Sequence, residues 1–109
     1  MVAKPIVYVS QSELWRVYAD GDYDGRLQRG ELLSRVVDDN HPSRPKAREP
    51  FCTRSQMIQL VRARDHAVLV LAHRYLRRDG TIGASGKPDP KRIYLADKIL
   101  TLDRSAAGS

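Results

Sequence analysis

One stretch of the chain limits the possible folds more than any other, the run from His66 to Leu76. Apolar residues fill every position from 67 to 72 in this run, which reads Ala-Val-Leu-Val-Leu-Ala. A strand that is apolar on both faces is usually buried on both faces. The run therefore predicts the central strand of a sheet.

The N-terminal residues predict a strand followed by a helix. Ile6 to Val9 alternates bulky residues, as a short strand does. Ser10-Gln-Ser-Glu13 forms a capping box, in which the serine and glutamate side chains satisfy unpaired amides at a helix start. The helix should end near Asp20-Gly21, and its apolar face is formed by Leu14, Val17 and Tyr18.

Two further helices are predicted in the middle of the chain. The first begins near Glu31 and has an apolar stripe of Leu32, Leu33, Val36 and Val37. The second opens on a capping box, Thr53-Arg-Ser-Gln56. Its core-facing residues would be Met57, Ile58, Leu60 and Val61, and it would run to Arg64.

Proline and glycine mark the loops. Three X-Pro steps between 40 and 50 predict an extended basic loop. Asp79-Gly80 predicts a tight turn, and the two prolines and two glycines from Gly83 to Pro90 predict irregular structure. The remaining segments, 92–95 and 99–102, predict a hairpin, with a helix across 92–102 as the competing interpretation.

Together these elements predict an α+β fold, with about three helices packed on a small, mainly antiparallel β-sheet. The 109 residues and the apolar fraction of 41% suit one domain with its own core. We expect this domain to span residues 1–104 and to be followed by a flexible tail, residues 105–109.

The composition also restricts the location of the protein. Cys52 is the one cysteine, so no disulfide can form within the chain. No apolar run approaches the length of a membrane span, and the apolar stretch at the N-terminus is too short for a signal peptide. We therefore expect a cytoplasmic protein that is not inserted in a membrane.

Charge is distributed unevenly along the chain. Residues 1–40 have 5 Lys or Arg against 7 Asp or Glu, whereas residues 41–109 have 14 against 6. A net charge of +8 in the second part predicts an anionic partner, and nucleic acid is the commonest one. The candidate contact residues are Arg44, Lys46, Arg48, Arg74, Arg77, Arg78, Lys87, Lys91 and Arg92.

An acidic segment, residues 20–31, has the spacing of a metal-binding loop. Asp20, Asp22 and Asp24 alternate, a glycine follows, and Glu31 closes the segment twelve residues from its start. This segment resembles an EF-hand calcium loop, which would curl so that every second side chain faces the ion. The resemblance implies calcium as the ligand, a backbone carbonyl from Arg26, and a protein-interaction module stabilised by the ion.

The segment from His73 to Arg92 combines glycines, prolines and basic residues. It loosely resembles small uncharacterised bacterial or prophage-type proteins of unknown activity, so this likeness implies no functional residue. Gly83-Ala-Ser-Gly86-Lys87 can expose successive amides to an anion. Pro88 excludes the helix that a nucleotide-binding P-loop requires.

Three functions remain open at this level. The first is a small basic accessory domain that binds an anionic partner, most often nucleic acid, without catalysis. The second is the calcium-stabilised interaction module. The third is a small metal-independent, toxin-like ribonuclease, in which His73, Arg74 and Lys87 would supply the acid, base and cationic groups.

Overall fold

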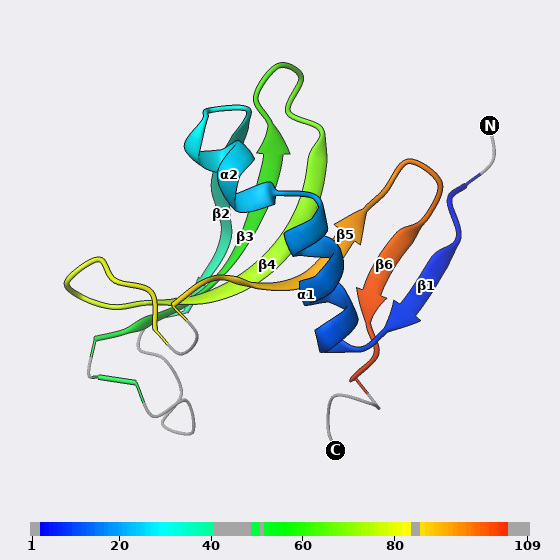
Figure 1. Ribbon diagram of the computed structural model, residues 1–109. Helices are drawn as coiled ribbons and strands as arrows, with labels where there is room; N and C mark the ends of the chain where they lie inside the picture. Colours follow the sequence, from blue (N-terminus) through cyan, green and yellow to red (C-terminus); the bar gives the residue numbers. More distant parts are fainter. Residues whose placement is uncertain (1–2, 41–48, 51, 84–85, 105–109) are drawn as a thin grey trace.

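The computed structural model describes residues 3–40, 49–50, 52–83 and 86–104. These residues form a six-stranded sheet with the order β1-β6-β5-β4-β3-β2 (Figure 1). β1 and β6 are parallel, and the other neighbouring strands are antiparallel. The elements are β1 (Ile6–Val9), α1 (Gln11–Asp20), α2 (Tyr23–Gln28), β2 (Leu32–Asn40), β3 (Arg54–Arg62), β4 (Val68–Leu76), β5 (Asp89–Tyr94) and β6 (Ile99–Leu102).

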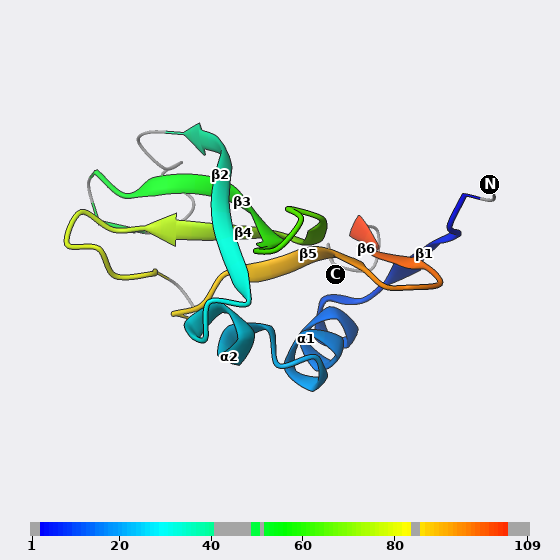
Figure 2. The same cartoon turned by 90° about the horizontal axis from the view of Figure 1, so that it is seen from above.

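Both helices lie on one side of the sheet, as the view in Figure 2 shows. α1 packs against β5 and β6, and α2 packs against β2. Burying apolar area between these layers is the main contribution to the stability of the fold. The core between helices and sheet is formed by Leu14, Tyr18, Tyr23, Leu32, Ile58, Leu60, Val70, Ala72, Ile93 and Leu100.

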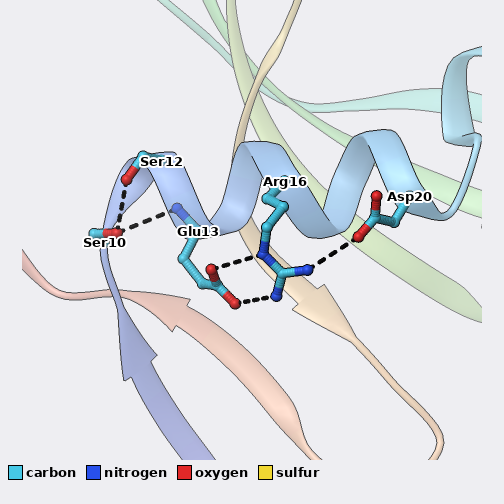
Figure 3. A network of polar contacts seen from close by, with 5 residues as sticks. All are labelled: Ser10, Ser12, Glu13, Arg16 and Asp20. Carbon is cyan, nitrogen blue, oxygen red and sulfur yellow. Dashed lines mark hydrogen bonds and ion pairs between the residues drawn. The ribbon is translucent and has the colours of Figure 1, made fainter.

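The predicted start of α1 is confirmed. The Ser10 hydroxyl accepts a hydrogen bond from the Glu13 amide at 3.2 Å, which satisfies one free N–H of the first turn (Figure 3). The Glu13 carboxylate is not drawn bonded to the Ser10 amide, the contact that would complete a capping box (Figure 3). Instead it pairs with Arg16, which also reaches Asp20 at 3.0 Å. The helix ends at Asp20, as expected.

The predicted fold class is wrong. The structure has a six-stranded mixed sheet and two short helices, rather than three helices on a small antiparallel sheet. The two helices expected from Glu31 onward and through Met57 to Arg64 are the strands β2 and β3. The short helix α2 was not predicted.

β2 lies at the edge of the sheet, and this position explains why the segment after Glu31 was predicted as a helix. Leu32 is buried, but its neighbour Leu33 is exposed, as the alternation of a strand requires. Val36 and Val37 are also exposed, and a bulge between Val36 and Asp38 shifts the pairing with β3. The four apolar residues therefore do not form one buried stripe, although their spacing is that of a helix.

β3 was mistaken for a helix because one of its inward residues is polar. Gln56, Ile58 and Leu60 alternate along the strand and are all buried. The amide oxygen of Gln56 accepts a hydrogen bond from Arg74 Nε at 2.8 Å, so its burial costs little. A buried glutamine hides the period of two that identifies a strand.

Other predicted elements are confirmed. β1 covers Ile6–Val9, and β4 lies inside the sheet between β3 and β5. Gly80 adopts the left-handed conformation in the predicted tight turn, with φ +89°. The C-terminal hairpin is present, which excludes the helix across 92–102. β5 begins at Asp89, so the irregular segment is shorter than expected.

Neither described helix has the length or the apolar character to cross a lipid bilayer. The expected tail, residues 105–109, lies outside the described residues.

Candidate functional site

A cavity of about 410 Å³ lies where β3 begins and β4 ends. The antiparallel register of these strands places Arg54 opposite Leu76, and Arg77 follows directly. Among the described residues, the charged side chains that line the cavity are all arginines. We call this site the arginine cavity, and its lining residues are Cys52, Arg54, Leu76, Arg77, Arg78 and Gly80.

Two of these arginines are held in place by carboxylates. Arg77 Nη2 lies 3.2 Å from Glu49 Oε2, and the Glu49 side chain is only 5% exposed. Arg54 Nη1 lies 3.0 Å from Asp39 Oδ2 on β2. Because a guanidinium has five N–H donors, one carboxylate leaves several donors for a second anion. The carboxylates thus orient both arginines without using all their hydrogen-bonding capacity.

Arg78 is the third arginine of the cavity, and it is exposed. It forms no ion pair with an acid in the described part of the chain. The nearby Asp79 accepts hydrogen bonds from the amide and hydroxyl of Thr81, and these bonds lower the pKa of its carboxyl. Asp79 does not line the cavity. Arg78 therefore provides a positive charge that is not tied up in an ion pair with any described acid.

The other predicted anion-binding residues that the structure describes do not line this cavity. Arg44, Lys46 and Arg48 lie outside the described residues. Arg74 donates to the buried Gln56, and Lys91 donates to Gln11 of α1 at 2.9 Å. Lys87 Nζ lies 3.7 Å from Asp24, and Arg92 lies within β5. Of the predicted residues that the structure describes, Arg77 and Arg78 lie together in the cavity.

The glycine-rich segment lies against a carboxylate of the same chain, the side chain of Glu49. A Cβ atom added to Gly83 would lie 1.7 Å from Glu49 Oε1, so the carboxylate occupies the space of a side chain at this position. Gly83 is buried, and its amide donates to the Tyr75 carbonyl at 2.7 Å. Residues 84–85 of the predicted anion nest lie outside the described part of the chain.

The acidic segment 20–31 is mostly helical. Asp20 ends α1, Asp24 lies in α2 together with Arg26, and Glu31 directly precedes β2. Asp22 lies between the helices with a left-handed backbone, φ 51°. The segment is therefore not followed by the helix that an EF-hand requires.

The acids of this segment are paired with other side chains. Asp20 pairs with Arg16, and Arg29 pairs with both Asp22 and Glu31. The Tyr18 hydroxyl donates to Asp24 Oδ1 at 2.7 Å. Burial, and then this bond, raise the pKa of Tyr18, so its hydroxyl remains a donor. No group of three or more potential ligands is arranged for a metal among the described residues. Calcium binding stays a prediction.

The three catalytic candidates lie apart. His73 and Arg74 are consecutive in β4, so their side chains point to opposite faces of the sheet. Lys87 lies beside α2 at Asp24. His73 Nε2 is 2.7 Å from the Ser55 hydroxyl, and its ring packs edge-on against Tyr75. The structure therefore does not assemble an acid, a base and a cation from these residues.

His73 makes the stability of the protein depend on pH. Burial, and then the charge of Lys91, lower the pKa of His73 below its ordinary value of 6.5, although Asp89 opposes this. As the pH falls, the unfolded chain therefore binds a proton before the folded chain does. The stabilisation by neutral His73 is complete above the unfolded pKa and is lost as the pH falls through the folded pKa.

We therefore expect the melting temperature to fall between pH 7.5 and pH 5, and to fall less steeply in His73→Gln. His66→Asn is the matched control, because His66 is exposed and has a left-handed backbone that asparagine tolerates. Equal slopes for the wild type and His73→Gln would contradict this expectation.

Two residues of the cavity region were missed by the sequence analysis, Arg54 and Glu49. Arg54 was assigned to a helix start, and only its pairing with Leu76 shows that it lies beside Arg77. Glu49 lies within the predicted basic loop and was not singled out. Its role depends on a contact with Arg77 that no local pattern indicates.

Comparisons with known proteins add no relative to these observations: no family model, no curated protein and no solved structure matches the chain.

Proposed function

We propose that this protein is a small accessory domain that binds nucleic acid without catalysis, and that the arginine cavity holds a backbone phosphate. The observation that carries the proposal is the convergence of Arg54, Arg77 and Arg78 on one cavity, which no acidic residue lines in the described part of the chain. Guanidinium groups match the geometry of phosphate oxygens with paired N–H donors.

The charge of the whole chain supports the same partner. Its formal net charge is +6, which attracts a polyanion over a longer range than any single contact. Asp39 and Glu49 hold two of the arginines in place before a ligand arrives, which reduces the entropy lost on binding. A phosphate in the cavity would add hydrogen bonds to N–H donors that these acids leave unused.

The proposal predicts binding that weakens steeply with salt. We expect affinity for a short labelled oligonucleotide to fall by about tenfold or more between 50 and 200 mM salt, because each phosphate contact releases counterions. Fluorescence anisotropy would measure this dependence. The paired change Arg54→Gln and Arg78→Gln should weaken binding and lower the salt slope by about one unit for each lost contact.

Arg16→Gln is the control for a loss of positive charge, because Arg16 is exposed on α1 and its ion pairs lie within that helix. It should change affinity much less than the changes in the cavity. No binding at 50 mM salt would refute the proposed function. Equal effects of Arg16→Gln and Arg78→Gln would show that net charge, rather than the cavity, determines affinity.

A further inference from the structure

The face of the sheet opposite the helices is crossed by one continuous row of side chains. Pairing across the strands connects six residues, one from each strand. Each of them alternates along its strand with a residue that faces the helices, so the six point to the other face. In sheet order the row is Tyr8, Thr101, Arg92, Leu71, Gln59 and Arg35.

No described helix covers this face, because α1 and α2 both lie on the other side (Figure 2). We call it the open face. Tyr8 is 65% exposed, and Arg92 and Tyr94 are partly exposed. Tyr94 lies two residues beyond Arg92 in β5, so both side chains point to the open face. Two aromatic rings and a guanidinium are therefore at least partly exposed on the same face of the sheet.

Within their strand bounds, the part of the open face formed by β1, β6 and the end of β5 has no acidic residue, although Asp103 directly follows β6. It consists of Ile6, Tyr8, Ile99, Thr101, Arg92 and Tyr94. Arg92 makes no ion pair with an acid of the described residues. By contrast, two acidic residues lie toward the other end of this face. Asp89 is the strand partner of His73, and Asp38 is the strand partner of Met57. The positive, acid-free part thus complements an anionic ligand that also has flat apolar groups.

We propose that this part of the open face stacks the bases of a single-stranded nucleic acid, with Tyr8 and Tyr94 as stacking rings and Arg92 as a planar cation between backbone and base. The inference rests on the proposed function and specifies the form of nucleic acid. Unstacked bases bind to aromatic rings and guanidinium planes, whereas a duplex keeps its base faces inside the helix.

The register gives the spacing of these groups. Tyr8 and Arg92 are two strands apart with Thr101 between them, which corresponds to about 10 Å across the sheet. Arg92 and Tyr94 are about 7 Å apart along β5. The three groups therefore lie at different positions on the surface, and each can contact a different base or linkage.

The test compares an oligothymidylate of about twelve nucleotides with an abasic strand of the same length, which has the same phosphates and no bases. We expect the oligothymidylate to bind about tenfold more tightly to the whole protein, because each stacked base adds to affinity. Tyr8→Ala and Tyr94→Ala should reduce this preference, whereas Tyr8→Phe and Tyr94→Phe should retain it. Arg92→Lys should keep the salt dependence and lose part of the preference.

The outcomes separate this inference from the proposed function. If both strands bind equally with a steep salt dependence, phosphate binding stands and base stacking is refuted. If neither strand binds, both proposals fail. Preferential binding of a duplex of the same length would also overturn the inference, as would a concentration-dependent dimer that Tyr8→Ala abolishes, because a second copy would then cover this face.

Discussion

Replacing Leu32 with alanine is expected to lower the free energy of unfolding by about 2–5 kcal/mol, the cost of a cavity in a packed core. Leu32 is 1% exposed at the start of β2 and belongs to the core beneath the helices. Chemical denaturation with urea would measure the loss. It is a large part of the total stability of a domain of this size.

The neighbouring leucine provides a matched control. Leu33 is 46% exposed, because successive residues of a strand point to opposite faces. Leu33→Ala should therefore cost less than about 1 kcal/mol. In a helix, both leucines would lie on the same apolar stripe and both changes would be costly. Equal and large losses in the two variants would contradict the assignment of β2.

Replacing Gly83 with alanine is the second change expected to have a large effect. The added methyl group would lie where the buried Glu49 carboxylate now lies, so the carboxylate would have to move from its position beside Arg77, which we expect to break their ion pair. Losing this interaction in a mostly buried site should cost about 2 kcal/mol. For a domain of this length, that corresponds to a fall in melting temperature on the order of 10 °C.

A double-mutant cycle identifies the cause of this effect. In a Glu49→Ala background the space beside Gly83 is free, so Gly83→Ala should cost much less than in the wild type. An equal cost in both backgrounds would show that the glycine is needed for its backbone rather than for the contact. Both single variants should also weaken oligonucleotide binding, because Glu49 orients Arg77 in the arginine cavity.

The sequence predicted the elements whose signals are local. The Ser10 cap, the apolar run of β4 and the turn at Gly80 each depend on neighbouring residues, and each is confirmed. The strands β2 and β3, which were predicted as helices, depend on distant partners instead. Gln56 is acceptable inside the sheet because Arg74 donates to it from the next strand. A single sequence contains no sign of that pairing, so tertiary contacts overrode the helical spacing.

The candidate site was predictable to a smaller extent. Arg77 and Arg78 were named from charge alone, but Arg54 and Glu49 reach the same region only through the strand register and a long-range ion pair. The acidic segment shows the opposite case. Its spacing suits a calcium loop, and the structure adds a contact from outside the segment, because Lys87 lies 3.7 Å from Asp24. Positions of opposite charges cannot be read from intervals within one segment.

The parallel pairing of β1 with β6 has a consequence for how the protein is made. The first described strand finds its partner in the last one, Ile6 beside Ile99. During synthesis β1 therefore leaves the ribosome well before β6 and stays without this neighbour until the intervening elements have also been made. Such a long-range closure is slow compared with local contacts. The sheet can thus be completed only after translation has passed β6.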